Sequence, residues 1–269
     1  MWTFRRNEND VVKLYDSLSP LMQLSTTGDM LNFGLWNDHI QSPIDAQNNL
    51  CKSVGEMANL SNAESLIDVG SGILGPAKKW HFDYPNLNIF AININFNQLR
   101  NSSQNSIQRI NATSRFLPFS NRSVDRIIAL ESAQHFKPLE VFLSESKRIL
   151  KHDGIFVMAI PTVLKNASGI RDLGILSFTW SSEHYTIEGI KEKIHQAGFK
   201  ILDEQNIGQN VYVSLADYYF EHREKLQTKI KTKFSSSTEK ILFYSLKKMK
   251  ELSENDRIGY VLLKCNAYS

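Results

Sequence analysis

Residues 66–75 read LIDVGSGILG, an apolar run that ends in an acid and then turns through spaced glycines. The pattern predicts a buried parallel strand that leads into a helix through a turn close to a ligand. Gly70 and Gly72 have no Cβ, so they can adopt a positive φ and let a nucleotide-like cofactor approach the backbone. The following helix would present free N–H groups and the positive end of its dipole.

A second buried strand is predicted at residues 88–95, with Asn93 at its carboxyl end. Asn93 stands where a βαβ unit places the group that binds the ribose hydroxyls, and a NAD-dependent enzyme would carry an acid there. An amide can still donate to and accept from a diol. Residues 109–112 (RINA) follow, and residues 125–136 (DRIIALESAQHF) predict a fourth strand that ends in a histidine-bearing turn.

In this order, the motifs resemble the class I S-adenosylmethionine-dependent methyltransferases, and most of all the small-molecule group that includes sugar and natural-product O-methyltransferases. The resemblance runs from residues 14–16 through 31–36 to 259–264. It implies the α/β fold class, with a seven-strand Rossmann-like sheet. It also implies S-adenosylmethionine as cofactor and a small-molecule acceptor.

The resemblance further implies a set of cofactor contacts. Asp68 would lie near the ammonium group or orient the loop, and Asn93 would hold the ribose. Asn111 would accept from the adenine amino group through its carbonyl oxygen, while Tyr15 and residues 33–36 close over the methionine side. The full set is Tyr15, Phe33, Trp36, Asp68, Gly70, Ser71, Gly72, Asn93, Ile94, Gln98, Asn111, Ala112 and Leu130.

His135 is the candidate catalytic residue. An alcohol is a poor nucleophile at neutral pH, and an imidazole that titrates near pH ~6.5 suits the removal of its proton. The alternative is a structural role, in which His135 caps the next helix or packs under a lid. An acid that the related enzymes carry after the fifth strand is replaced by Pro161. Any assisting carboxylate would therefore come from elsewhere, with Glu131 and Glu183 as the candidates.

The composition excludes several classes of protein. A net charge of +3 over 269 residues does not indicate a nucleic-acid partner. No apolar run has the length of a transmembrane helix or a signal peptide, so we expect a cytoplasmic protein without integral membrane association. Cys51 and Cys265 do not form a disulfide framework, and no metal-ligand spacing is present. The oligomeric state cannot be predicted from these features.

The predicted organisation has two parts. Residues 1–62 form an N-terminal helical cap, in which Ser42-Pro43 starts a helix, and residues 63–269 form the methyltransferase core. The core carries a lid loop at 164–185 and an insertion at 215–255 with two amphipathic helices, placed between the last two strands. Those two strands are predicted at 199–207 and 258–265.

Other functions stay open at this stage. A C- or N-methyltransferase acting on a lipid-like or amine small molecule would work by proximity, without a base. A non-catalytic cofactor-binding protein would fit the replacement of acids by Asn93, Asn111 and Pro161. A NAD-dependent oxidoreductase would explain the glycines but not residues 111–119. A nucleic-acid methyltransferase is disfavoured, because Leu130-Glu131-Ser132 lacks the proline-aromatic clamp for a flipped base.

Overall fold

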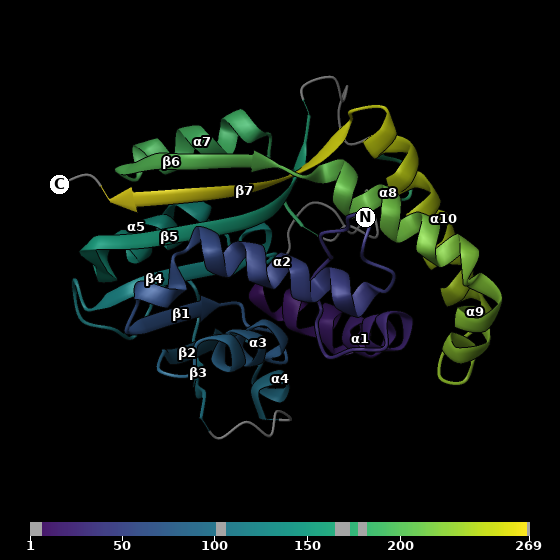
Figure 1. The fold of residues 1–269 in the computed structure, drawn as a ribbon, viewed down its shortest axis with the longest axis horizontal. Coiled ribbons are helices and arrows are strands. Elements are labelled where there is room, and N and C mark those ends of the chain that lie inside the picture. The colour runs from purple at the N-terminus through teal and green to yellow at the C-terminus, as the bar shows by residue number, and fades with distance from the viewer. Residues whose placement is uncertain (1–6, 101–105, 165–172, 177–181, 268–269) are drawn as a thin grey trace.

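The computed structural model describes residues 7–100, 106–164, 173–176 and 182–267 (Figure 1). Its centre is a seven-stranded sheet in the order β3-β2-β1-β4-β5-β7-β6, in which β7 runs antiparallel to both of its neighbours. The strands are β1 (Ser65–Val69), β2 (Asn88–Asn93), β3 (Gln108–Asn111), β4 (Val124–Leu130), β5 (Leu150–Val163), β6 (Phe199–Asn206) and β7 (Ile258–Ala267). The predicted class I sheet is therefore confirmed.

Helices cover both faces of this sheet. They are α1 (Glu8–Thr26), α2 (Pro43–Met57), α3 (Gly75–Asp83), α4 (Phe96–Arg100), α5 (Leu139–Ile149), α7 (Ile187–Gln196), α8 (Gly208–Glu221), α9 (Arg223–Lys231) and α10 (Ser236–Glu254). One core lies under α2, α3, α8 and α10, and a second core lies under α5 and α7. Short 3-10 turns occur at Leu60–Asn62 and Ala133–His135.

Strand β1 shows why the sequence folds this way. Leu66 belongs to one core, whereas Ile67 and Val69 belong to the other. Successive side chains of a strand point to opposite faces, so a central strand covered on both sides must be apolar throughout. Asp68 interrupts this run and is nevertheless almost fully buried. Because burying a carboxyl is costly, a polar residue at this point indicates a site rather than core packing.

The N-terminal region folds as two helices: α1 lies at the carboxyl ends of the strands and α2 lies across one face of the sheet (Figure 1). Pro43 is the first residue of α2, and the Ser42 side chain accepts a hydrogen bond from Asp45 N at 3.2 Å. This is the helix start that the sequence predicts, since Ser at the N-cap and Pro at the first helical position both favour it.

The insertion between β6 and β7 differs from the prediction. It begins at Gly208 instead of residue 215, and it contains the three helices α8, α9 and α10 instead of two. Gly208 is a poor helix former, and the N-cap residue Ile207 makes no side-chain capping bond, so the usual start signals are missing from the sequence. Most of the predicted lid loop, 165–172 and 177–181, lies outside the described residues.

A buried charge cluster holds the inserted helices together. Glu239 of α10 is fully buried and accepts hydrogen bonds from Arg223 Nε at 2.9 Å, Gln227 Nε2 at 2.9 Å and Tyr219 Oη at 3.2 Å. Helix α9 in turn lies against α1. The insertion therefore packs as one unit against the N-terminal helix that covers the strand ends.

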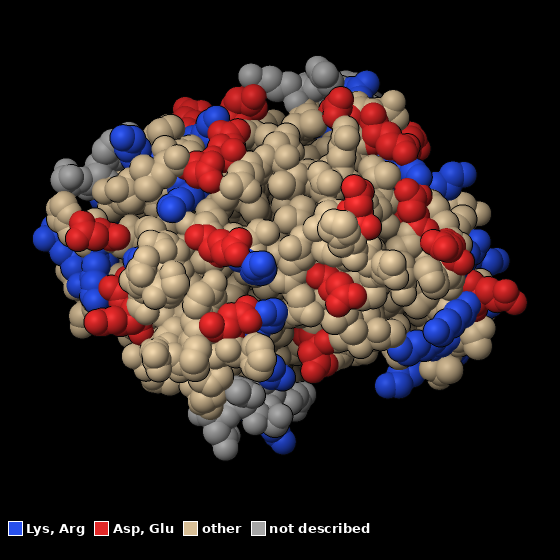
Figure 2. Space-filling model, viewed as in Figure 1, with Lys and Arg blue, Asp and Glu red and all other residues tan. Residues whose placement is uncertain are grey.

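The described part of the molecule has two further global features. Lys/Arg and Asp/Glu side chains are intermixed on the face shown in Figure 2, in keeping with the small net charge. Among the helices of the described residues, none has both the length and the apolar character needed to span a bilayer.

Candidate active site

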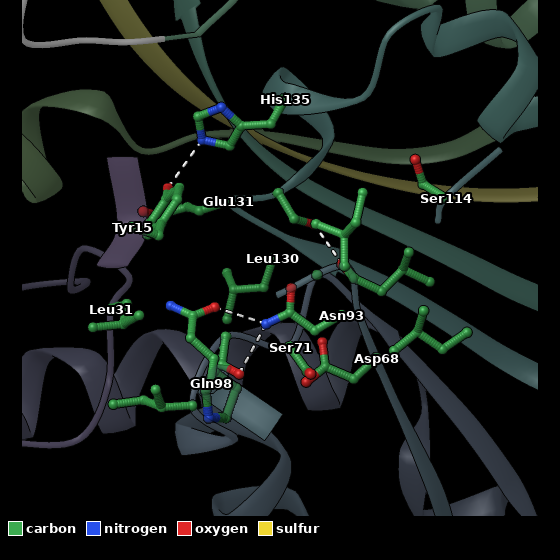
Figure 3. A pocket seen from close by; sticks show the side chains of 18 of the residues that line it. Tyr15, Leu31, Asp68, Ser71, Asn93, Gln98, Ser114, Leu130, Glu131 and His135 are labelled. Atoms are coloured by element: carbon green, nitrogen blue, oxygen red, sulfur yellow. Dashed lines mark hydrogen bonds between the residues drawn. The ribbon is translucent and has the colours of Figure 1, made fainter. Parts of the chain in front are cut away.

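A cavity opens at the carboxyl ends of β1, β2 and β4 and is closed over by α1 (Figure 3). The empty space inside it, together with its open mouth, is about 940 Å³. Most of the residues predicted from the sequence line it: Tyr15, Asp68, Gly70, Ser71, Gly72, Asn93, Ile94, Gln98, Ala112, Leu130 and His135. The ends of parallel strands thus gather here residues that are far apart in sequence.

Three predicted residues do not line the cavity. Phe33 packs edge-on against Tyr212, and Trp36 packs against Tyr218. Asn111 is exposed beside the cavity rather than in its wall. The sequence analysis missed Leu31, Asn32, Ser114 and Ser132, which do line it. Residues 31 and 32 belong to the 31–36 motif, so this motif reaches the cavity through Leu31 and Asn32 and not through Phe33 and Trp36.

Different structural constraints favour glycine at positions 70 and 72 of the turn. Both have a positive φ, 81° at Gly70 and 54° at Gly72. A Cβ on Gly70 would lie 2.3 Å from the Ser132 Cβ, whereas a Cβ on Gly72 would come no closer than 3.4 Å to Leu31. Gly70 is therefore required first by the packing of the β1 turn against the β4 turn. The prediction that it also lets a cofactor approach the backbone stays a prediction.

Asp68 and Ser71 supply polar atoms without partners at the bottom of the cavity. Asp68 is 2% exposed, and its Oδ2 has no hydrogen-bond partner among the described residues. Burial raises the pKa of the Asp68 carboxyl to about 7. The buried Ser71 Oγ likewise lacks a described partner. A cationic ligand group would satisfy these atoms, as the ammonium end of S-adenosylmethionine does, so the residues fit the predicted cofactor.

The two amides, Asn93 and Asn111, are fixed by hydrogen bonds. Asn93 Nδ2 donates to Gly72 O at 3.0 Å and to Gln98 Oε1 at 2.7 Å. Asn111 Nδ2 donates to the backbone oxygens of Asn93 at 2.8 Å and Ile94 at 3.0 Å. Each amide nitrogen has two hydrogens, so both donors are used within the chain. Ligand recognition is then left to the two carbonyl oxygens. Asn93 Oδ1 already accepts from Asn95 N at 3.1 Å and keeps one lone pair for a ribose hydroxyl, and Asn111 Oδ1 can accept from an adenine amino group.

His135 lies on the opposite side of the cavity from Asp68, at the end of the 3-10 turn after β4 (Figure 3). Its Nε2 is hydrogen-bonded to the Tyr15 hydroxyl at 2.9 Å, and the two rings meet edge to face. Tyr15 comes from α1, so the N-terminal helix contributes directly to the histidine site. Burial and the charge of Glu131 raise the pKa of Tyr15, which keeps its hydroxyl protonated.

The two candidate carboxylates, Glu131 and Glu183, lie in different environments. Glu131 lines the cavity, and its Oε1 accepts from Phe33 N and from Tyr260 Oη, both at 2.8 Å. Burial raises the pKa of Glu131 to about 8, and these two bonds only partly oppose the shift. Glu183 instead forms an ion pair with Lys137 at the surface and does not line the cavity. Glu131 is therefore the carboxyl group of the His135 region.

Residues 67–158 match the methyltransferase domain family. The erythromycin 3''-O-methyltransferase of Saccharopolyspora erythraea is 24% identical over 282 residues, covering 96% of this chain and 88% of that protein. Among solved structures, the cyclopropane synthase MmaA2 of Mycobacterium tuberculosis superposes with a TM-score of 0.83 at 16% identity, covering 97% of this chain and 98% of that one. The [4+2]-cyclase SpnF superposes with a TM-score of 0.78 at 18% identity, with coverages of 97% and 96%.

The cofactor follows from the domain match and the cavity together. The methyltransferase match contains the glycine turn, Asn93, Asn111 and His135, and it decides for S-adenosylmethionine over NAD. Within the described residues, no cluster of three or more His, Cys, Asp or Glu side chains is arranged to hold a metal ion.

Proposed function

We propose that the chain, which is a class I S-adenosylmethionine-dependent methyltransferase, transfers its methyl group to a hydroxyl of a small natural-product acceptor such as a sugar. The observation that carries this proposal is the 2.9 Å contact between His135 Nε2 and the Tyr15 hydroxyl at the cavity wall. A base is needed for a hydroxyl acceptor but not for an acceptor that is already nucleophilic. The similarity to an erythromycin O-methyltransferase over 96% of the chain supports the same acceptor atom.

In this proposal His135 is the general base. When bound, the cofactor supplies a methyl group made electrophilic by its sulfonium. The acceptor oxygen forms the new O–C bond as the S–C bond breaks, and the sulfur keeps that electron pair. His135 takes the hydroxyl proton, and Tyr15 holds the imidazole in place through its hydrogen bond and the edge-to-face ring contact. Asp68 and Asn93 orient the cofactor from the other side of the cavity.

We also propose the division of the chain into an N-terminal cap at 1–62 and a core at 63–269, with the loop at 164–185 and the inserted helices as a lid. The packing of α9 on α1 supports the lid, because it connects the insertion with the helix that carries Tyr15. Such covers exclude water from the reacting groups.

The test is a turnover assay with methyl-labelled cofactor against fractionated small-molecule extract of the source cell, with mass analysis of the labelled product. His135→Ala should lower kcat by roughly 100-fold to 10,000-fold, with little change in cofactor affinity. His152→Ala is the matched control, because this exposed side chain lies near the amino end of β5, away from the carboxyl ends of the strands that form the cavity. In wild type the rate should rise with pH as the imidazole loses its proton.

Two outcomes would contradict the proposal. A labelled product with the methyl group on carbon or nitrogen would exclude the hydroxyl acceptor. A His135→Ala variant that keeps more than about half of the wild-type kcat would remove the base, leaving a mechanism in which the enzyme only aligns the two reactants.

A further inference from the structure

A continuous chain of hydrogen bonds connects the end of β2 with the helix that carries Tyr15. Asn93 Nδ2 donates to Gln98 Oε1 at 2.7 Å, and Gln98 Nε2 donates to Ser19 Oγ at 2.9 Å. Ser19 Oγ in turn donates to the backbone oxygen of Tyr15 at 2.6 Å, and the Tyr15 hydroxyl is hydrogen-bonded to His135. Figure 3 shows the bonds at the two ends of this series, between Asn93 and Gln98 and between Tyr15 and His135. Asn93, Gln98 and Ser19 are all buried.

The direction of these bonds is fixed from the glycine turn. The backbone oxygen of Gly72 can only accept, so the Asn93 atom 3.0 Å away from it is the amide nitrogen. The same nitrogen meets Gln98, which must therefore accept through Oε1 and is left with Nε2 to donate to Ser19. The Ser19 hydroxyl accepts this bond, and its own hydrogen is free to reach Tyr15 O. Each side chain thus has only one orientation that satisfies its neighbours.

The bonds from the core reach α1 at its weakest turn. Pro20 lies inside this helix and has no N–H, so the backbone oxygen of Asp16 receives no helical hydrogen bond from it. On this same turn, Ser19 accepts from Gln98, and the Asp16 carboxylate accepts from Asn95 Nδ2 at 2.8 Å. Asn95 Oδ1 also accepts from Gln98 N at 3.2 Å, so the two core amides are bonded to each other. The position of this turn of α1 therefore depends on side chains that follow β2.

We propose that Gln98 and Ser19 are positioning residues, which couple cofactor binding at Asn93 to the placement of Tyr15 against His135. Ser19 does not line the cavity and acts only through α1. The part of this proposal that concerns the cofactor and α1 needs no acceptor. The part that extends to His135 rests on the proposed hydroxyl methylation, in which the imidazole is the base.

The coupling has a physical basis in the polarity of the chain. A ribose hydroxyl that donates to the remaining lone pair of Asn93 Oδ1 polarises the amide and strengthens the bonds that its Nδ2 donates. Hydrogen bonds in series polarise one another, so the effect extends through Gln98 to Ser19. The Tyr15 turn of α1 is then held more firmly when the cofactor is present. By linkage, a turn that is held in place also raises the affinity for the cofactor.

Hydrogen exchange of the α1 amides tests the coupling without any acceptor. It is measured without ligand and at saturating S-adenosylhomocysteine, with α7, which packs in the other core, as the internal reference. Ser19→Ala and Gln98→Ala interrupt the chain. Ser17→Ala is the matched control for the first variant, because the exposed Ser17 makes the same kind of bond, to Lys13 O at 3.3 Å. Asn97→Ala is the control for the second, since Asn97 is the exposed amide next to Gln98 in α4.

We expect S-adenosylhomocysteine to slow exchange in α1, relative to α7, by about threefold or more in wild type and in both controls. In Ser19→Ala and Gln98→Ala the slowing should fall to less than half of that factor, and the ligand should bind roughly 2-fold to 10-fold more weakly. A purely structural role would change exchange in the ligand-free variants but leave the factor caused by the ligand intact. The same factor in Ser19→Ala as in Ser17→Ala would therefore overturn the proposal.

The link to His135 is tested by turnover with the acceptor found in the labelling assay. Ser19→Ala should lower kcat by roughly threefold to tenfold at saturating cofactor, with little change in KM for the acceptor. In a Tyr15→Phe background, which lacks the hydroxyl bonded to His135, the same change should cause little further loss. Fully additive losses would overturn the link through Tyr15. Failure of His135→Ala to slow turnover would instead refute the proposed function and leave the exchange result for α1 unaffected.

Discussion

Replacing Asp68 by Asn should change the pH dependence of stability in a calculable way. Burial raises the pKa of Asp68 from 3.8 to about 7 in the folded protein. The folded chain therefore holds this proton more tightly than the unfolded chain, and the resulting stability is fully present below pH 4 and is lost as the pH rises through 7. Between pH 5 and pH 8 the ionisation of Asp68 lowers the free energy of unfolding by the equivalent of about two pKa units, or about 3 kcal/mol.

Because asparagine does not ionise, the stability of the variant does not fall with pH for this reason. The free energy of unfolding of Asp68→Asn minus that of wild type should increase by about 3 kcal/mol from pH 5 to pH 8, equivalent to roughly 5–10 °C in Tm for a chain of this size. Urea unfolding of the ligand-free proteins at both pH values measures it. The change with pH is the informative quantity, because the hydrogen bonding of the Asn itself cancels between the two measurements.

The same variant tests the cofactor assignment. Asn cannot offer a negative charge to the ammonium group, so S-adenosylmethionine should bind about 10-fold to 100-fold more weakly. The cofactor should then raise the Tm of wild type at pH 8 more than that of the variant. A pH-independent difference in unfolding free energy would refute the buried, unpartnered state of Asp68. Unchanged cofactor affinity would refute its place in the site.

Two further predictions concern the glycine turn and the cover over the site. Gly70→Ala should destabilise the fold by at least about 3 kcal/mol in urea unfolding, because the added Cβ would collide with Ser132. Gly72→Ala should destabilise it by only about 1–2 kcal/mol, the cost of the left-handed conformation. Equal losses in the two variants would refute this distinction. Hydrogen exchange should slow in α1 and α9 when S-adenosylmethionine binds, since α1 covers the cavity and α9 packs on α1, and unchanged exchange in both helices would count against a lid.

Much of the core could be predicted from the sequence, because its signals are local. The apolar run into Asp68, the spaced glycines and the Ser42-Pro43 cap each depend on a few neighbouring residues, and the structure confirms the strand and helix that they predict. The start of α8 at Gly208 could not be predicted in this way, since its N-cap residue Ile207 makes no side-chain capping bond and glycine is a poor helix former. Its position is set by the end of β6 and by packing against the sheet.

The site was predictable to the extent that it sits at the ends of strands. Asp68, Asn93 and Leu130 come at those ends, so the topology alone brings them together. The roles of Glu131 and Glu183 depend instead on long-range contacts, with Phe33 and Tyr260 in one case and Lys137 in the other. No local pattern distinguishes a carboxyl that turns into the cavity from one that pairs at the surface.

The chemistry of this fold is decided by few side chains. The sheet is shared with a cyclopropane synthase and with a [4+2]-cyclase, so the sheet by itself does not select a reaction. In this chain the side of the cavity opposite Asp68 carries His135, which is hydrogen-bonded to the Tyr15 hydroxyl, and Glu131. An imidazole beside the cavity can take a proton from an acceptor, and this supports the proposed methylation of a hydroxyl.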